Sequence, residues 1–218
     1  MKIAVIEDHA LMRGLLIKAC QETMPDATVA GARDAASGLA LCRELQPDVV
    51  LLDLALPDRD GLDLLDDLLA ASRGAKVICI TSYTDEVTMH RALRSRLHGF
   101  IDKNEENVDH LTTAIATVLA GERYFSPAAR RARVLLGNDP QAFDKILSAR
   151  EQDLLRWFGR GLSNGEIAAE VNLSELTVRN HRNRTMAKLG LRTTAELIRY
   201  ALEKGFARVE PSGPQVCH

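Results

Sequence analysis

Short apolar runs alternate with amphipathic stretches through the first half of the chain. Each run lacks a polar break and is bounded by charged residues, proline or glycine, which is typical of strands buried on both faces. The expected strands are Lys2–Ile6, Thr28–Gly31, Val49–Asp53, Val77–Thr81 and Phe100–Ile101. Helical spacing between them predicts helices at Ala10–Met24, Ala35–Leu45, Gly61–Ala71, Glu86–Arg94 and Val108–Ala120. This alternation implies βαβ units, so we predict an α/β domain with a doubly wound, five-stranded parallel sheet.

The last part of the chain shows only helical patterns. Serine or threonine followed three residues later by glutamate occurs at 148–151, 163–166 and 193–196, and each pair matches the capping box that starts a helix. Together with Ser174 as a further N-cap, these signals predict helices at 149–159, 164–171, 175–188 and 194–204. Only three residues separate the second and third of these helices, which is the spacing of a helix-turn-helix. We therefore predict a second, all-α domain of four helices.

Between these regions the pattern is lost. The segment contains two prolines, two glycines and a run of arginines, which indicates a linker with a short helix over 128–136. The predicted organisation is a first domain at 1–122, a linker at 123–146, a helical domain at 147–208 and a tail at 209–218.

Composition and charge narrow the class of protein. The chain has 218 residues, of which 46% are hydrophobic and 27% charged, and it contains no apolar stretch long enough to span a membrane. Its four cysteines lie far apart without a zinc-site or disulfide pattern, so we expect a cytoplasmic protein that has no membrane partner. The net charge of −2 combines an acidic first half with a basic second half. A basic second domain is compatible with a polyanionic partner.

Polar and charged residues follow the expected strands where each strand ends. Glu7 and Asp8 follow the first strand, Asp53 ends the third, Thr81 ends the fourth and Lys103 follows the fifth. The carboxyl ends of parallel strands meet at one edge of a sheet, where ligands bind. Carboxylates gathered there repel each other unless a cation joins them, and oxygen ligands of this kind suit Mg²⁺. With Asp53 as nucleophile and Thr81 and Lys103 as phosphoryl-binding groups, the set predicts an aspartyl-phosphate site.

A hydrolase of the haloacid dehalogenase type is the enzymatic alternative, because it also uses an aspartate after an apolar strand. That family has a second aspartate two residues later, and here Ala55 occupies the position. We therefore expect that the chain is not an enzyme.

The strand-end residues resemble the signature of bacterial response-regulator receiver domains, over about residues 1–122. The matching residues are Glu7, Asp8, Asp53, Thr81, Ser82, Phe100 and Lys103. The resemblance implies a flavodoxin-like fold in which Glu7, Asp8, Asp53 and the backbone carbonyl of Ala55 ligate Mg²⁺. It also implies that a sensor histidine kinase phosphorylates Asp53, that Thr81 and Lys103 bind the phosphoryl group, and that Thr81 and Phe100 form the switch. Such receivers usually carry Ala-Gly-Ala before the fifth strand, whereas this chain has Ser95, Arg96 and Leu97.

The third helix of the second domain carries basic and amide side chains on the face opposite its apolar residues. Arginine can read guanine edges and asparagine can read adenine edges, and both also reach phosphates. This helix is the second helix of the predicted helix-turn-helix. Its polar face therefore predicts an interface with double-stranded DNA.

From Leu147 onward the chain resembles the LuxR-type DNA-binding domain, and the receiver in front gives the layout of NarL/FixJ-type transcription regulators. By this resemblance Arg179, Asn180 and Asn183 read bases. The residues expected to contact the DNA backbone are Ser174, Thr177, Arg182, Arg184 and Lys188. The resemblance further implies a homodimer when active, with the last helix as the dimerisation helix, and RNA polymerase as a candidate partner. Thr185 stands where the family commonly has an aliphatic residue.

Two functions remain open at this point. The first is a two-component response regulator in which phosphorylation of Asp53 controls dimerisation, DNA binding and transcription. The second is a DNA-binding regulator whose receiver works without phosphorylation.

Overall fold

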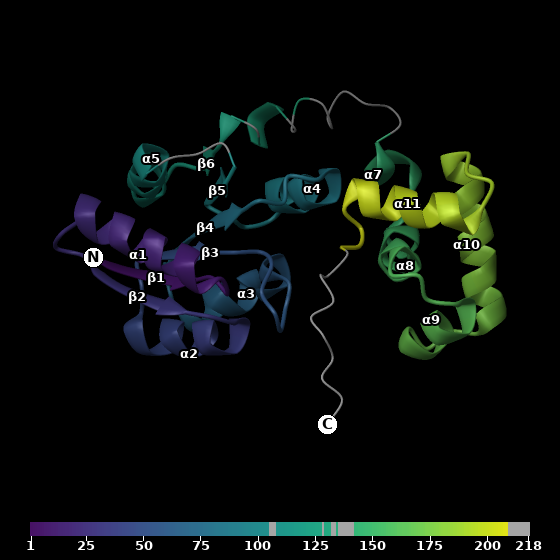
Figure 1. Ribbon diagram of the computed structural model, residues 1–218, viewed down its shortest axis with the longest axis horizontal. Helices are drawn as coiled ribbons and strands as arrows, with labels where there is room; N and C mark the ends of the chain where they lie inside the picture. Colours follow the sequence, from purple (N-terminus) through teal and green to yellow (C-terminus); the bar gives the residue numbers. More distant parts are fainter. Residues whose placement is uncertain (105–107, 128, 132–133, 135–141, 209–218) are drawn as a thin grey trace. The chain divides into compact units, whose positions relative to one another are not determined.

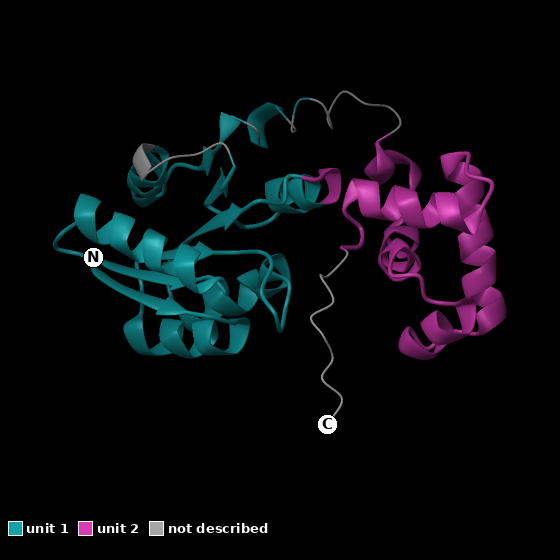
Figure 2. Cartoon of the chain, viewed as in Figure 1, with its two compact units in different colours: residues 1–84, 88–135 teal, residues 85–87, 136–218 magenta. Residues whose placement is uncertain are grey.

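The structure is a computed structural model that describes residues 1–104, 108–127, 129–131, 134 and 142–208. It divides into two compact units, which Figure 2 shows in different colours. Unit 1 comprises Met1–Thr84 and Thr88–Leu135, and unit 2 comprises Asp85–Val87 and Leu136–His218.

Unit 1 is built on a parallel sheet. Within the described part of the chain the sheet contains six strands in the order β2-β1-β3-β4-β5-β6, and every neighbouring pair is parallel (Figure 1). The strands are β1 Lys2–Ile6, β2 Thr28–Ala32, β3 Val49–Leu52, β4 Lys76–Thr81, β5 Gly99–Asp102 and β6 Tyr124–Phe125. Strand β2 lies on one side of β1, and the strands from β3 to β6 follow on the other side. This order is that of a doubly wound fold.

The sixth strand corrects the expected count of five. Tyr124 pairs with Gly99 and Phe125 pairs with Phe100, although both aromatic residues fall in the segment expected to be linker. Two residues are too few to give a strand pattern, so the strand is created by its neighbour rather than by its own sequence. Arg123 reinforces the pairing because its Nε donates to the carbonyl of Leu97 and its guanidinium lies 4.8 Å from the ring of Phe125.

Helices cover both faces of this sheet. Their bounds are α1 Ala10–Thr23, α2 Ala35–Leu45, α3 Gly61–Ala71, α4 Glu86–Arg94 and α5 Val108–Leu119. Helices α1 and α5 lie on one face, and α2 and α3 lie on the other (Figure 1). Helix α4 lies beside α3, because Arg91 of α4 forms ion pairs with Asp60 and Asp63 at 3.2 and 2.6 Å.

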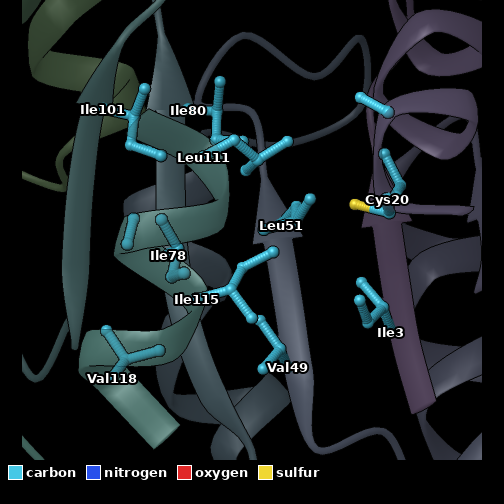
Figure 3. Close-up of a cluster of buried hydrophobic side chains, with 13 residues drawn as sticks. Ile3, Cys20, Val49, Leu51, Ile78, Ile80, Ile101, Leu111, Ile115 and Val118 are labelled. Atoms are coloured by element: carbon cyan, nitrogen blue, oxygen red, sulfur yellow. The ribbon is translucent and has the colours of Figure 1, made fainter. Parts of the chain in front are cut away.

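The core between the sheet and helices α1 and α5 is built from alternate strand residues (Figure 3). Successive side chains of a strand point to opposite faces, so Ile3, Leu51 and Ile78 share this face while their neighbours point to the other. From α5, Leu111, Ile115 and Val118 point toward the sheet. Both faces are covered, which explains why the strands read as continuous apolar runs.

Unit 2 is helical. Its helices are α7 Phe143–Ile146, α8 Ala149–Gly159, α9 Asn164–Glu170, α10 Glu175–Leu189 and α11 Thr194–Lys204. The four expected helices are confirmed, and each of the expected capping boxes forms at the start of α8, α9 and α11. The single turn α7 is an addition, and it lies in the segment expected to be linker.

The turn α7 forms because it completes the core of unit 2. Phe143 is buried and meets the ring of Phe206 edge to face, with centroids 5.1 Å apart. The same core contains Leu154, Phe158 and Leu197 from α8 and α11. A one-turn helix has little stability alone, so packing of its aromatic residue decides its presence.

The short helix expected over 128–136 lies partly outside the described residues. Residues 127, 129–131 and 134 are helical. The tail at 209–218 also lies outside the described residues. Among the helices that the structure describes, none combines the length and the apolar character that crossing a membrane requires.

Candidate functional site

The strand-end residues meet at the carboxyl edge of the sheet in unit 1. Strands β1, β3, β4 and β5 are direct neighbours, so the residues that end or follow them converge at one edge. The structure thus brings together the expected set of Glu7, Asp8, Asp53, Thr81 and Lys103.

Three carboxylates form an acidic cluster, defined as Glu7, Asp8 and Asp53. One oxygen from each carboxylate lies within 4.8 Å of the others. Glu7 is 1% exposed and Asp53 is 6% exposed, whereas Asp8 is open to solvent. Carboxylate oxygens at this spacing with one open side are the donor set that Mg²⁺ prefers, so these residues fit the ion.

Lys103 offsets part of the negative charge of the acidic cluster. Its Nζ lies 2.6 Å from Oε2 of Glu7 and 3.1 Å from Oδ2 of Asp53. Burial acts to lower the pKa of Lys103, but the negative charges of Asp53 and Glu7 outweigh burial and raise that pKa. Lys103 therefore stays charged and holds the two buried carboxylates together.

The electrostatics of Glu7 favour a cation at this edge. Burial raises the pKa of Glu7, the charge of Asp53 raises it further, and the contact with Lys103 lowers it only in part. A single ammonium group thus leaves the cluster short of positive charge. A divalent cation would remove the remaining repulsion.

Backbone hydrogen bonds and the loop that follows β3 fix the position of Asp53. Its N–H donates to the carbonyl of Ile6 at 2.9 Å, and its Oδ1 accepts the N–H of Leu54 at 2.8 Å. The loop then closes against the start of α3, where a Cβ on Gly61 would lie 2.3 Å from the carbonyl oxygen of Asp53. Glycine is required at position 61 because the two backbones approach so closely. An isolated bridge between Ala55 and Asp60 fixes the loop that carries the Ala55 carbonyl.

Thr81 and Phe100 lie on the same face of the sheet. Phe100 pairs in register with Cys79, two residues before Thr81, and paired residues point to the same side. Both side chains are fully buried, and Oγ1 of Thr81 accepts the N–H of Tyr83 at 3.2 Å. The backbone N–H of Lys103 also donates to the carbonyl of Thr81, which joins the ends of β4 and β5.

The second candidate site is the exposed side of α10 in unit 2. Arg179, Asn180 and Asn183 are exposed there, as is Arg184. A hollow of about 190 Å³ lies between Thr177, Asn180, His181 and Arg184. These groups offer hydrogen-bond donors and acceptors to a partner, as base edges and phosphates require.

Arg182 and Lys188 differ from the rest of the expected set. The guanidinium of Arg182 donates to the carbonyl of Leu162 at 3.1 Å and lies 4.6 Å from the ring centroid of Phe158. Burial lowers the pKa of Arg182. Nζ of Lys188 pairs with the buried carboxylate of Glu151 at 2.7 Å. Both side chains therefore join α10 to the remainder of unit 2, a role that their residue type did not indicate.

Ser174 and Thr177 prepare the start of α10. Oγ of Ser174 accepts the N–H of Thr177 at 3.1 Å, and the two hydroxyl oxygens lie 2.7 Å apart. Between them in the sequence, Leu176 is 57% exposed.

Two family models match the chain. The response regulator receiver domain matches residues 3–116, and the luxR family of bacterial regulatory proteins matches residues 145–201. The first match falls in unit 1 apart from residues 85–87 and contains the acidic cluster, and the second contains α10.

Curated relatives match nearly the whole chain. The transcriptional regulatory protein MctR of Rhizobium johnstonii is 34% identical over 94% of each chain. The oxygen regulatory protein NreC of Staphylococcus carnosus is 32% identical, covering 94% of this chain and 98% of the relative.

Solved structures share the fold. RcsB of Salmonella enterica serovar Typhimurium, bound to a promoter in the presence of a phosphomimetic, matches with a TM-score of 0.64 at 23% identity over 92% of this chain and 97% of that chain. The response regulator ChrA of a heme-sensing two-component system is 28% identical with a TM-score of 0.53, over 94% and 98%. With a receiver site in unit 1, a helix-turn-helix in unit 2 and relatives that match both, the chain belongs to the NarL/FixJ-type two-component response regulators, which carry a LuxR-type DNA-binding domain.

Proposed function

We propose that a sensor histidine kinase phosphorylates Asp53 and that this modification controls dimerisation and sequence-specific binding of double-stranded DNA, which regulates transcription. The observation that carries the proposal is the position of Asp53. Its carboxylate is almost buried, and it faces the ammonium group of Lys103 and the carboxylates of Glu7 and Asp8.

The transfer step is a substitution at phosphorus. An oxygen of Asp53 forms a bond to phosphorus, the bond from phosphorus to the donor imidazole nitrogen breaks, and that nitrogen keeps the electron pair. The acidic cluster and the Ala55 carbonyl would hold Mg²⁺, which supplies positive charge to the phosphoryl oxygens. Lys103 provides a second positive charge, and the Thr81 hydroxyl can donate a hydrogen bond to a phosphoryl oxygen.

The same residues suggest how modification changes the domain. Oδ2 of Asp53 now contacts Lys103, and Oγ1 of Thr81 now accepts the N–H of Tyr83. A phosphoryl group on Asp53 would offer new acceptors to both side chains. Movement of Thr81 would change the space beside Phe100, which shares its face of the sheet, so a local charge change would bias the conformation of the domain.

For DNA recognition, the proposed base-reading residues are Arg179, Asn180 and Asn183, and the proposed backbone contacts are Ser174, Thr177, Arg182, Arg184 and Lys188. Arg182 and Lys188 also position the helix through Phe158 and Glu151. One recognition helix covers a short stretch of major groove, so a homodimer on two half-sites would supply the specificity. RNA polymerase is a further partner for a regulator that activates transcription.

Phosphorylation is tested by incubating the full chain with acetyl phosphate and Mg²⁺ and measuring its intact mass. We expect the wild type to gain one phosphoryl group and Asp53→Asn to gain none, because the nucleophilic oxygen pair is lost. Asp66→Asn is the matched control, since Asp66 is an exposed carboxylate elsewhere in unit 1. Equal labelling of Asp53→Asn and wild type would overturn the site assignment.

DNA affinity measured with and without beryllofluoride separates the two functions left open by the sequence. A regulator gated by phosphorylation gains affinity when beryllofluoride and Mg²⁺ are added, and Asp53→Asn shows no gain. If the affinity is the same under both conditions, the receiver works without phosphorylation.

A further inference from the structure

A basic pocket lies at the amino edge of the sheet in unit 1, the edge opposite to the acidic cluster. It has a volume of about 420 Å³, and the basic residues that line it are Lys76, Arg96, His98 and Arg123. We refer to these four residues as the basic pocket. It includes Arg96, the residue at which this chain departs most clearly from the receiver pattern.

Sheet topology creates this pocket. Lys76 begins β4, His98 precedes β5 and Arg123 precedes β6, and these three strands are neighbours in register. Their amino ends therefore bring the three side chains to one edge. Arg96 reaches the same place from the turn that joins α4 to β5.

The charges around His98 define the sign of the electrostatic field in the pocket. Burial lowers the pKa of His98, and the positive charges of Lys76, Arg123 and Arg96 lower it further. Nδ1 of His98 accepts the N–H of Val77 at 3.1 Å, which also requires an unprotonated nitrogen. The three basic side chains therefore lie close enough to His98 to act on it together.

Structural roles account for only part of the basic pocket. Arg123 donates to the carbonyls of Leu97 and Ser95 and lies over Phe125, so it supports the fold. Those two bonds use two of the five N–H donors of a guanidinium. Arg96 lies 3.7 Å from Asp66, but both side chains are largely exposed, and such pairs contribute little to stability. The fold does not explain why Arg96 and Lys76 carry charge at this edge.

We propose that the basic pocket binds a small anion that carries phosphate groups. Arginine guanidinium groups match phosphate oxygens in pairs, and a lysine ammonium adds a point charge. The hollow has a volume within the range of small-molecule sites. Leu97 and Ala75 also line the hollow, and both side chains are almost fully buried. This site is separate from Asp53 and from α10, and it does not depend on the proposed phosphorylation.

An amide-resolved NMR titration of the full chain with pyrophosphate tests the proposal. The titration is done without Mg²⁺ so that the acidic cluster does not hold phosphate. We expect saturable shifts of the backbone amides of Leu97, His98 and Gly99, at pyrophosphate concentrations that leave the amides around Asp53 unchanged. Shifts confined to α10 would overturn the proposal, because they would show that only the DNA-facing side binds the anion.

Charge reversal identifies the residues that bind. Arg96→Glu should weaken pyrophosphate binding at these amides by about tenfold or more, because it replaces attraction by repulsion at an exposed position. Arg43→Glu is the matched control, since Arg43 is exposed in α2 and does not line the pocket, and it should leave the dissociation constant unchanged. Equal weakening by the two variants, or none by Arg96→Glu, would overturn the proposal.

A parallel titration with ADP separates two sources of the phosphate groups. Tighter binding of ADP than of pyrophosphate indicates a nucleotide whose nucleoside adds contacts to those of the phosphate groups. Equal binding indicates that the pocket recognises the phosphate groups alone. Both results support a phosphate site, and failure of both ligands to shift the pocket amides contradicts it.

Discussion

At the scale of single residues, Thr185 shows how one polar atom can lower stability. Its side chain is fully buried in α10, and its Oγ1 has no hydrogen-bond partner among the described residues. A buried hydroxyl without a partner costs free energy because it has lost its hydrogen bonds to water. The family commonly has an aliphatic residue here, which agrees with this cost.

We expect Thr185→Val to stabilise unit 2 by about 1 kcal/mol, because valine has the same shape and needs no hydrogen bond. Urea unfolding followed by tryptophan fluorescence measures the effect in unit 2, since Trp157 of α8 is the single tryptophan. Thr194→Val is the control at an exposed position, and its free energy of unfolding should change by less than about 0.5 kcal/mol. A loss of stability in Thr185→Val would show that the hydroxyl has a partner after all.

At the scale of elements, Glu151 joins two helices. It closes the capping box at the start of α8, and its carboxylate also accepts from Nζ of Lys188 in α10. Burial alone would raise the pKa of Glu151, but the bonds from Lys188 and Ser148 outweigh it and lower that pKa. The folded state therefore stabilises the ionised carboxylate of Glu151 more than the unfolded chain does.

This lowered pKa gives a dependence of stability on pH. Glu151 contributes fully above its unfolded pKa of about 4.3, and its contribution is lost as the pH falls through the lower folded pKa. We expect Glu151→Gln to unfold more easily than the wild type at pH 7, by about 1–3 kcal/mol, because charged hydrogen bonds are lost. The difference should shrink as the pH falls below the unfolded pKa.

Trp157 fluorescence during urea unfolding at a series of pH values measures this difference. Glu170→Gln is the matched control, because Glu170 is exposed at the end of α9. It should track the wild type at every pH. A gap between Glu151→Gln and the wild type that stays constant down to the lowest pH would contradict the linkage.

At the scale of the whole molecule, charged and polar groups gather at separate places. The carboxyl edge of the sheet gathers carboxylates, its amino edge gathers basic groups, and the exposed side of α10 carries arginine and asparagine. Each arrangement follows from parallel strands or from one helix face, because these geometries bring residues distant in sequence to one place.

Arg179 and Arg182 both belong to α10, but we expect substitution of Arg179 to affect DNA binding and substitution of Arg182 to affect folding. Arg179→Ala should weaken binding to a duplex selected by the wild type from random sequences by about 1–3 kcal/mol, since a base contact is lost. Its urea unfolding should not change, because Arg179 is exposed. Arg182→Ala should instead lower the stability of unit 2, because it loses the contacts with Phe158 and Leu162. Fluorescence anisotropy with labelled DNA and Trp157 unfolding measure the two effects. Unchanged DNA affinity in Arg179→Ala would mean that the recognition face is misplaced.

The sequence by itself determined the pattern of both units. Continuous apolar runs with intervening amphipathic stretches specify the first five strands and their helices, and paired Ser or Thr and Glu residues mark the starts of α8, α9 and α11. These signals are local, so they need no knowledge of the fold. The acidic cluster was also predictable, because Asp53 and its partners all stand at the ends of apolar runs.

Only the tertiary structure decided features that depend on a partner distant in the chain. The strand β6 exists because β5 offers it an edge, and α7 exists because Phe143 meets Phe206. Arg182 and Lys188 are expected to contact DNA by residue type, and only the fold shows that they also contact Phe158 and Glu151 within unit 2. Such roles are set by packing and charge pairing, which no local pattern encodes.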